Sequence, residues 1–242
     1  MKITYLFHSG FIVETDRHFM VFDYFKDSCK KSKYRDCGQL KREDIPEDKK
    51  VLIFVSHGHC DHFSKEIFAF EKPNVEYIFD AGVAAGNEAS NIHRFLPYES
   101  HYIGDVMIKT YGSTDEGVSF FIEVDGMKIF HAGDLNWWHW TGESEEERAY
   151  AKQFFEKEMS LIDEMAMDVA FFPVDPRLEE AYYYGGEYFI RRIHPKVFIP
   201  MHFQDGYEFT RKFKEHMGDC GTEIITIDSR GTVVFEKGGT ED

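Results

Sequence analysis

The sequence predicts an α/β protein in which two sheets pack together with helices on the outside. Runs of strands with helices interspersed occur twice along the 242 residues, once in each half of the chain. Several strands are continuous apolar segments such as Val51–Val55, a pattern typical of strands buried on both faces. No low-complexity linker separates the halves, so we expect a single domain over residues 1–242.

The first half is predicted to contain five short strands and one helix. The second and third strands are joined across Asp16-Arg17 as a hairpin, and a charged loop follows the third strand. The helix is expected to begin near Ser64. The strands are expected at 2–7, 10–15, 18–24, 51–55 and 75–79.

The second half contains a hairpin around the tight-turn pair Asp125-Gly126. The strongest helix pattern begins with a capping box formed by Ser144 and Glu147. The elements expected in this half are the hairpin strands 118–124 and 127–131, helices at 145–165, 186–193 and 208–216, strands at 169–174 and 197–201, and a final hairpin of 223–227 with 232–235.

The formal net charge is −16, from 28 Lys and Arg residues against 44 Asp and Glu residues. Such a chain repels phosphate backbones and anionic membranes, so we expect neither a nucleic acid nor a membrane as its partner. No signal peptide opens the sequence, and no apolar run approaches the roughly 20 residues that span a bilayer. We therefore expect a cytoplasmic protein with reduced thiols. Cys29 and Cys37 flank a Lys-rich stretch and are candidates to bind a metal, but no CxxC pair supports this, so the expectation is two free loop thiols.

The strongest chemical motif is His57-Gly58-His59-Cys60-Asp61-His62. It follows the buried strand directly, and its imidazoles and carboxylate are ligands that suit divalent zinc, iron or manganese. In an extended loop, His57 and His59 can hold one ion from the same side. The next turn of the loop can aim Asp61 and His62 at a second ion. The alternative is a solvated polar loop.

A histidine-rich motif of this form after a buried strand resembles the defining HxHxDH motif of the metallo-β-lactamase fold hydrolases. The resemblance covers most of the chain, and its opening segment is similar to the start of the branch that includes ascorbate-phosphate lactonase-like proteins. It implies a four-layer αββα sandwich with metals at one edge of the two sheets. The further segments that carry it are Phe7–Phe11, Val21–Asp23, Phe130–Asp134 and Phe198–Phe203.

The same resemblance implies a set of metal ligands and one or two divalent ions, with zinc expected first and manganese or iron as alternatives. Asp134 would bridge the two metal positions. Taken alone, Asp134 is also compatible with a turn residue after Gly133, and His202 with a buried core histidine. The implied ligands are His57 and His59 at site one, Asp61, His62 and His202 at site two, and Asp134 between them.

One position departs from the family pattern. Ser113 stands where the family usually supplies a third histidine to site one, and a neutral hydroxyl is a poor zinc ligand. Asp115 and His8 are candidates to complete that site. Their alternative roles are a turn residue before Gly117 and a hydrogen-bonding histidine at a strand end.

All three tryptophans lie in the segment Trp137-Trp138-His139-Trp140, directly after the predicted ligand Asp134. Their wide faces suit either a substrate pocket or the packing of the following helix, and the sequence leaves both open. His139 is a candidate proton donor or partner of a metal ligand, or else an exposed loop histidine.

Two residues follow the strand at 169–174. Arg177 is a candidate to bind a carboxylate or phosphate of a substrate, and Asp175 to orient a ligand histidine. The alternative for both is a polar loop.

These observations predict a metal-dependent hydrolase that acts on a small, anionic lactone, ester or phosphodiester, with Asp61 as a proton acceptor. The substrate class rests on fold analogy. Because Ser113 replaces the expected ligand, the alternative is a catalytically silent protein of the same fold that binds a metal or a ligand. An iron-dependent redox enzyme is a third possibility.

Overall fold

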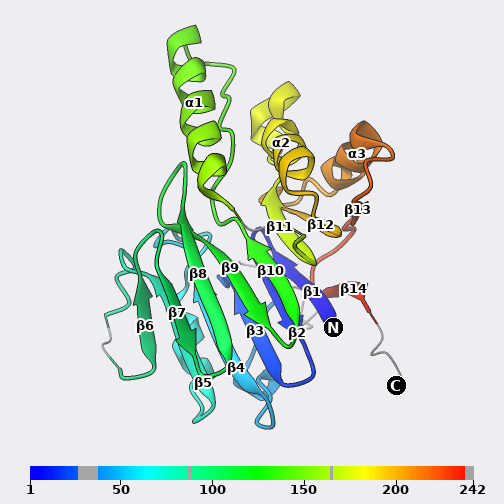
Figure 1. Cartoon of the computed structure of the whole chain (residues 1–242). Coiled ribbons are helices and arrows are strands. Elements are labelled where there is room, and N and C mark those ends of the chain that lie inside the picture. The colour runs from blue at the N-terminus through cyan, green and yellow to red at the C-terminus, as the bar shows by residue number, and fades with distance from the viewer. Residues whose placement is uncertain (27–37, 87–88, 164–165, 238–242) are drawn as a thin grey trace. The chain divides into compact units, whose positions relative to one another are not determined.

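The computed structural model describes residues 1–26, 38–86, 89–163 and 166–237, so Cys29 and Cys37 lie outside the described residues. The chain divides into two compact units. The first comprises residues 1–95 together with 228–242, and the second comprises residues 96–227. Each unit builds one seven-stranded sheet, the first drawn mostly in blue and cyan and the second mostly in green and yellow (Figure 1).

The sheet of the first unit has the strand order β14-β1-β2-β3-β4-β5-β6. Its pairs are antiparallel from β14 to β3 and parallel from β3 to β6. Strands β1, β3, β4 and β5 therefore run in one direction and end at the same edge of the sheet. The strands are β1 (Lys2–Phe7), β2 (Gly10–Glu14), β3 (His18–Phe22), β4 (Lys50–Val55), β5 (Val75–Asp80), β6 (Ile92–Phe95) and β14 (Thr232–Glu236).

One face of this sheet is covered by the short 3-10 helix η3 (Lys65–Phe70), whose Ile67 joins the same buried cluster as Ile53 and Phe79. The helix expected near Ser64 is thus a 3-10 helix. Ser64 caps it by accepting a hydrogen bond from the amide of Glu66 at 3.3 Å. With six residues the segment is longer than most 3-10 helices. A further 3-10 turn, η2, spans Arg42–Asp44.

The sheet of the second unit has the order β13-β12-β11-β10-β9-β8-β7. It is parallel from β13 to β10 and antiparallel from β10 to β7. The predicted hairpin is confirmed, since Asp125 and Gly126 join β9 to β10 with φ angles of 47° and 73°. The strands are β7 (Ser100–Ile103), β8 (Val106–Gly112), β9 (Val118–Val124), β10 (Met127–His131), β11 (Val169–Pro173), β12 (Val197–Met201) and β13 (Glu223–Ile224).

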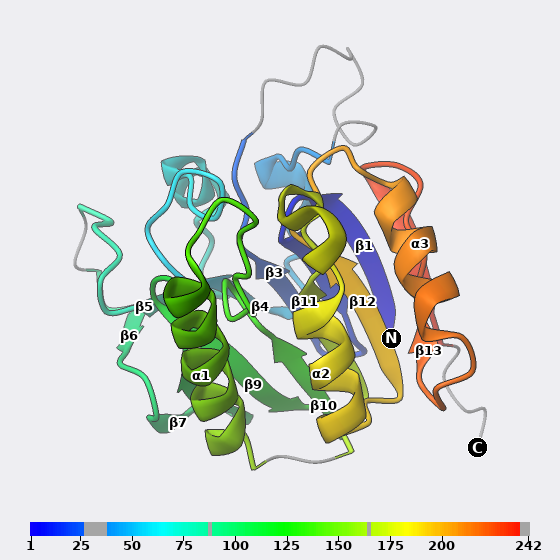
Figure 2. The same cartoon turned by 90° about the horizontal axis from the view of Figure 1, so that it is seen from above.

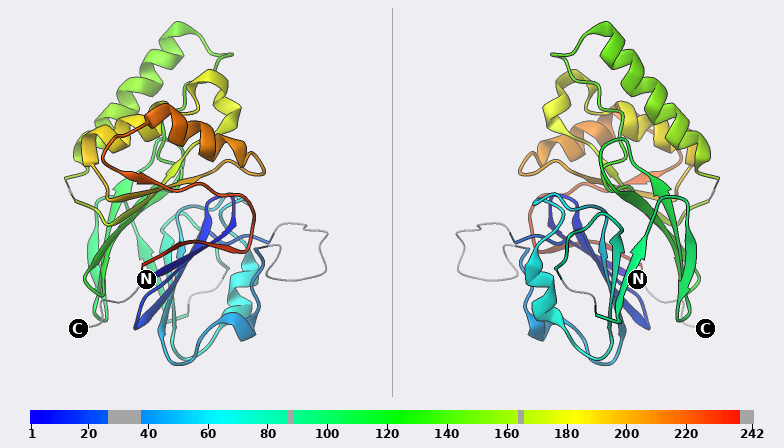
Figure 3. Two further views of the ribbon diagram at one scale, coloured as in Figure 1. Left: turned by 90° about the vertical axis from the view of Figure 1, so that its right-hand side faces the viewer. Right: turned by 90° about the vertical axis from the view of Figure 1, so that its left-hand side faces the viewer.

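Helices α1 (Glu145–Leu161), α2 (Tyr184–Ile193) and α3 (Glu208–Met217) lie on one face of the second sheet (Figures 2 and 3). Phenylalanines make this contact. The ring of Phe189 on α2 lies 4.7 Å from that of Phe172, and the ring of Phe213 on α3 lies 5.1 Å from that of Phe198. A short 3-10 helix, η4 (Pro176–Ala181), precedes α2. Two mixed sheets with helices confirm the predicted α/β class.

The long helix α1 begins as predicted and ends earlier. Its capping box is present, since the Glu147 amide donates to Ser144 Oγ at 3.2 Å and the Ser144 amide donates to the Glu147 carboxylate at 2.8 Å. The helix ends at Leu161 because Ile162 adopts an extended conformation, with a ψ of 104°. Within the described residues, no helix has both the length and the hydrophobicity needed to cross a bilayer.

The predicted final hairpin is wrong. Its first segment forms β13, which pairs with β12 in the second unit. Its second segment forms β14, which pairs with β1 in the first unit. Two neighbouring strand patterns looked like a hairpin, but the pairing partners come from distant parts of the sequence. Strands β6, β7 and β8 were not predicted. Strands β6 and β7 are short, with four residues each, and mix polar and apolar residues without a clear alternation.

Candidate metal centre

In the first unit, the strand directions bring the predicted ligands to one edge. His8 follows β1, Asp23 follows β3 and His57 follows β4, and these strands all end at the same side of the sheet. The carboxyl ends of parallel strands are where α/β proteins place their ligand-binding residues. The sequence folds in this way because β3 and β4 are apolar after their first residues, His18 and Lys50, and polar residues begin again where the strands end.

The pair His57 and His59 stands at the start of the loop after β4. The distance from His57 Nε2 to His59 Nδ1 is 3.0 Å, and Ser56 Oγ lies 3.0 Å from His57 Nδ1. A tight turn follows, in which the amides of His62 and Phe63 donate to the carbonyl of His59 at 3.0 and 2.9 Å. The turn explains how the loop carries a second pair of ligand residues.

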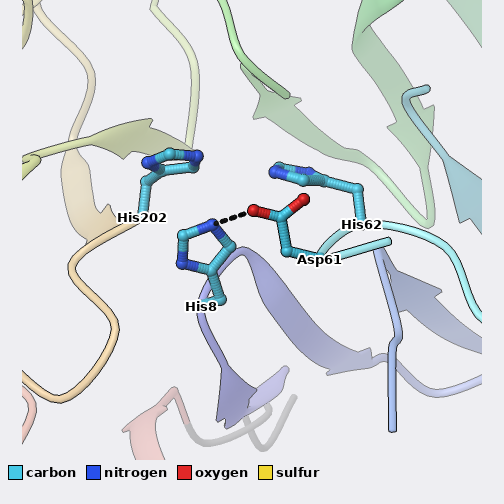
Figure 4. A group of neighbouring side chains, drawn as sticks. All are labelled: His8, Asp61, His62 and His202. Atoms are coloured by element: carbon cyan, nitrogen blue, oxygen red, sulfur yellow. Dashed lines mark ion pairs between the residues drawn. The ribbon is translucent and has the colours of Figure 1, made fainter. Parts of the chain in front are cut away.

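That second pair, Asp61 and His62, lies with His8 (Figure 4). These three residues each offer a ligand atom within 4.8 Å of the others, and His8 Nε2 lies 3.5 Å from Asp61 Oδ2. The hydrogen bond from His8, together with the nearby His62, lowers the pKa of Asp61 below its ordinary value. Within this unit His8 thus accompanies the residues predicted for site two.

His62 is oriented by a buried carboxylate, Asp23. The distance from His62 Nδ1 to Asp23 Oδ2 is 2.8 Å, and Ser56 donates to Asp23 from both its amide and its hydroxyl at 2.7 Å. A carboxylate at Nδ1 favours the tautomer with the proton on that nitrogen, which makes Nε2 the ligand atom. The sequence analysis did not name Asp23 as a site residue. Its position directly after β3, the parallel neighbour of β4, is the feature that could have identified it.

The second unit repeats this arrangement with different strands. Asp134, Asp175 and His202 follow β10, β11 and β12, which are parallel neighbours and end at one edge. His202 Nε2 lies 3.3 Å from Asp134 Oδ1, and both residues are buried. Two predicted metal ligands of this unit therefore lie side by side.

Asp175 orients His202, as hypothesised from the sequence. The distance from His202 Nδ1 to Asp175 Oδ2 is 2.9 Å. Arg177 donates to the same carboxylate from Nε and Nη2, the latter at 2.6 Å, although 49% of its side chain is exposed. Burial raises the pKa of Asp175, but the hydrogen bonds from His202 and Arg177 outweigh burial and lower it to about 2.

The stretch that lacks the expected third histidine forms a compact turn in the second unit. Ser113 Oγ accepts a hydrogen bond from the amide of Asp115 at 3.2 Å. Thr114 Oγ1 accepts from the amide of Asn136 at 2.9 Å, which ties the turn to the segment after Asp134. In the described part of the chain, Asp115 belongs to no group of three His, Cys, Asp or Glu residues that could hold an ion. The participation of Ser113 and Asp115 remains a prediction.

The tryptophan segment is divided between two tasks. Trp138 lies beside the ligand residues, since its Nε1 donates to the Asp134 carbonyl at 3.1 Å and its ring lies 5.5 Å from that of His202. Trp137 packs instead on the helices, with ring distances of 6.1 Å to Phe155 and 5.2 Å to Tyr184. The packing role thus applies to Trp137, and a place for Trp138 in a substrate pocket stays a prediction.

His139 packs against Trp137 and Tyr184, at ring distances of 6.3 and 5.3 Å. Burial, together with the positive charge of Arg148, lowers the pKa of His139. A neutral imidazole donates a hydrogen bond more readily than it donates a proton in catalysis. Its role as a proton donor therefore remains a prediction.

Comparison with known proteins identifies the family. The Beta-lactamase superfamily domain matches residues 2–147, which is more than half of the chain. A UPF0173 metal-dependent hydrolase from Nanoarchaeum equitans is 26% identical over 94% of this chain and 96% of its own length. Another from Pelotomaculum thermopropionicum is 23% identical over 84% of each chain. These findings confirm the predicted class of metal-dependent hydrolases.

Solved structures share the fold. Igni18, a metallo hydrolase from Ignicoccus hospitalis, is 20% identical with a TM-score of 0.62, covering 98% of this chain and 99% of that one. CmlA, a diiron β-hydroxylase from Streptomyces venezuelae, is 10% identical with a TM-score of 0.62, covering 94% of this chain and 53% of that one. At such identities the likeness shows the fold and does not select a reaction. By its matched domain and its two mixed sheets, the chain belongs to the β-lactamase superfamily and has the metallo-β-lactamase fold.

Proposed function

We propose that the chain hydrolyses a small anionic substrate (a lactone, an ester or a phosphodiester) with one or two divalent ions, zinc first and manganese or iron as alternatives. The observation that carries the proposal is the pair of carboxylate–histidine contacts, Asp23 with His62 and Asp175 with His202. Metal-binding histidines commonly have such a partner on the second ring nitrogen. The proposed ligands are His57, His59, Asp61, His62, Asp134 and His202.

The donor chemistry fits such ions. Imidazole nitrogens and carboxylate oxygens bind zinc, manganese and iron. Within the second unit, the 3.3 Å between His202 Nε2 and Asp134 Oδ1 is short enough for both atoms to contact one ion. We propose that residues 1–242 act as one functional domain.

A bound divalent ion would lower the pKa of a coordinated water and polarise the bond to be hydrolysed. Asp61 is proposed to accept a proton from the attacking water because it lies in the loop that carries the proposed ligands. The lowered pKa of Asp61 keeps the carboxylate ionised but also makes it a weak base. Asp23 and Asp175 keep the rings of His62 and His202 in place. Arg177 and His139 are the proposed contacts of the substrate, because both carry hydrogen-bond donors close to the segments that hold the ligands.

The substrate is proposed to be a small molecule because the net charge of −16 disfavours nucleic acids and anionic membranes. We also propose a cytoplasmic location, on the expectation of reduced thiols.

The test is to measure zinc, iron and manganese per chain in protein purified without chelator, and to assay phosphodiesters, lactones and esters with and without chelator. His57→Ala and Asp134→Ala are expected to lose bound metal and hydrolysis together. His93→Ala is the matched control, because His93 pairs with Glu76 at 2.8 Å and is not a proposed ligand. Hydrolysis that survives complete removal of metal would refute the mechanism.

Ser113 supports a second candidate function, a catalytically silent protein that binds metal or ligand. A serine at this position removes one ligand that the family usually provides. Tight metal retention with no hydrolysis of any substrate class would favour this candidate. If Ser113→His raises the metal content and the hydrolytic rate together, the serine is the cause of a weak first site.

A further inference from the structure

Three buried polar atoms without a hydrogen-bond partner occur within one four-residue stretch of the second unit. They are Asn136 Nδ2, Trp137 Nε1 and His139 Nδ1, and the described residues provide no partner for any of them. Asn136 is only 1% exposed. An unsatisfied buried donor destabilises a folded protein, so native proteins usually pair such groups with a neighbour, a water or a ligand. Three in one stretch indicate a missing acceptor.

All three residues lie against the first turn of α2. A Cβ atom built on Gly185 would collide with Asn136 Oδ1 and would stand 3.1 Å from the amide nitrogen of Trp137. The rings of Trp137 and His139 lie 5.2 and 5.3 Å from that of Tyr184, the first residue of α2. Glycine at position 185 is therefore what allows this close approach.

The first turn of a helix carries amide groups without a partner inside the helix and the positive end of the helix dipole. Helix α2 has 10 residues, and the side chain of its N-cap residue, Tyr183, makes no capping hydrogen bond. Gly185 and Gly186 have no side chains of their own, so Asn136 approaches the backbone of this turn at Gly185 and the ring of Phe213 approaches it at Gly186. Such helix ends bind anions when other donors converge on them.

The charges nearby have the matching sign. Lys152 Nζ lies 5.4 Å from the centroid of the Trp137 ring. Arg148 is close enough for its positive charge to lower the pKa of His139. The indole N–H and the amide NH₂ can only donate hydrogen bonds, and Nδ1 of a histidine donates when it carries the ring proton. A ligand that satisfies these atoms must present acceptor oxygens, and a negative charge suits the two cations.

We propose that Asn136, Trp137 and His139, together with the first turn of α2, bind an oxyanion, the carboxylate or phosphate group of the substrate. That this oxyanion belongs to the substrate rests on the proposed function. Asn136 lies two residues after the proposed ligand Asp134 in the sequence. The proposed oxyanion site and the proposed metal site therefore share one short segment of the chain. Binding of the oxyanion itself requires neither metal nor hydrolysis.

The test uses the indole N–H resonances of the full-length protein, because the chain has only three tryptophans. Inorganic phosphate and acetate are titrated separately into chelator-treated protein, and the titrations are repeated with zinc added. The Trp137 indole N–H is expected to shift with saturation, whereas those of Trp138 and Trp140 shift much less. A response to phosphate alone indicates a phosphate-bearing substrate, and a response to acetate alone indicates a carboxylate-bearing one.

Trp137→Phe keeps an aromatic ring and removes the donor, and it is expected to weaken binding of the responding anion by about 10-fold or more, measured by calorimetry. Trp140→Phe is the matched control, since Trp140 stacks on Trp138 at 5.8 Å and belongs to no part of this cluster; its affinity should stay within about twofold of the wild-type value. Asn136→Asp adds a negative charge and should abolish binding. If that variant does not fold, the affinities of Trp137→Phe and Trp140→Phe still test the proposal.

Several outcomes would overturn the proposal. They are a Trp137 resonance that does not move, equal shifts of all three indoles, binding only after zinc is added, or unchanged affinity in Trp137→Phe. The first outcome, with the indole proton in contact with an ordered water, would mean that a structural water satisfies these donors. Failure of the proposed function would appear separately, as absent metal or hydrolysis in a protein that still binds the anion.

Discussion

Each unit of the molecule holds one histidine against a buried carboxylate, but the two carboxylates are fixed by different means. Asp23 in the first unit accepts hydrogen bonds from the amide and the hydroxyl of Ser56, at 2.7 Å each. Asp175 in the second unit accepts from Arg177, a cation whose side chain is 49% exposed. The first carboxylate is held by neutral groups, and the second by the amide of Arg177 at 2.9 Å and by an ion pair that reaches the solvent.

Both carboxylates hold a histidine ring in place, but the groups that hold the carboxylates should respond differently to salt and to the loss of their partner. Neutral donors inside a protein keep their partner at any salt concentration, but they cannot be replaced by water if the partner is removed. An ion pair at the surface is screened by salt, and its cation can turn to the solvent. The first pair should therefore contribute more to stability, and the second should respond more to the solvent.

The largest expected effect is the loss of stability on removing each carboxylate. Asp23→Ala leaves three buried donors of Ser56 and His62 without an acceptor and should lower the free energy of unfolding by about 3–5 kcal/mol. Asp175→Ala should lower it by about 2 kcal/mol, because Arg177 can turn to water. Urea unfolding of the metal-free proteins measures both values.

The exposed Asp219→Ala is the matched control and should change stability by less than about 0.5 kcal/mol. If Asp175→Ala lowers the free energy of unfolding as much as Asp23→Ala does, Arg177 does not regain hydrogen bonds by turning to water. The expected difference in stability between the two pairs would then be refuted.

The next effect concerns metal affinity, and here the two units should behave alike. Asp23→Asn and Asp175→Asn keep the shape of the side chain but weaken the hydrogen bond to the ligand histidine. Loss of such a partner typically lowers metal affinity by about 10- to 100-fold. Competition with a chromogenic chelator for zinc gives the affinities. Asp168→Asn is the control, since Asp168 accepts from the Lys128 amide at 2.8 Å and contacts no proposed ligand.

An effect of Asp23→Asn alone would show that only His62 binds the metal. An effect of Asp175→Asn alone would show the same for His202. No effect of either would mean that the two carboxylates serve the fold and not the metal.

The pH dependence of stability should reveal the ion pair of the second unit. The pKa of Asp175 lies at about 2, below its ordinary value of 3.8. A carboxyl group with a depressed pKa stabilises the folded state above its unfolded pKa, and this stabilisation disappears as the pH falls through the folded pKa. The wild-type protein should therefore exceed Asp175→Asn by about 2 kcal/mol above pH ~4, and this advantage should vanish near pH ~2.

Urea unfolding between those pH values, in both proteins, measures the difference directly. The same comparison for Asp168→Asn controls for the titration of all other carboxylates. A stability difference that does not change with pH would show that the ion pair does not set the pKa of Asp175.

How much the sequence predicts depends on how local each feature is. The tight turn at Asp125-Gly126 and the apolar strand Val51–Val55 are recognisable within a few residues, and both were predicted correctly. The final hairpin failed because β14 pairs with β1, and nothing in the segment itself indicates a partner more than 200 residues away. Local patterns decide which segments are strands, while the partner of a strand at the sheet edge is decided by the whole chain.

The candidate site shows the same division. The histidine-rich loop is contiguous in the sequence, so its residues could be proposed as ligands together. Asp23 and Ser56 come from different strands, and their contact depends on β3 being the parallel neighbour of β4. Asp175 could be hypothesised because it directly follows a strand in the stretch before His202. The donors of Asn136 and Trp137 were not predictable, since only the packing of α2 buries them.

The smallest expected effects are the losses of stability on replacing Ser56 and Arg177, the residues that hold the two carboxylates. Ser56→Ala removes a buried neutral donor and should lower the free energy of unfolding by about 1 kcal/mol at any salt concentration. Arg177→Gln removes a half-exposed cation and should cost less than about 1 kcal/mol at low salt and nearly nothing at about 1 M salt, where screening is strong. Arg191→Gln is the control, because Arg191 forms an exposed ion pair with Glu187 away from the site. A cost of Arg177→Gln that persists at high salt would show that the guanidinium acts through its hydrogen-bond geometry and not through its charge, and the second unit would then resemble the first.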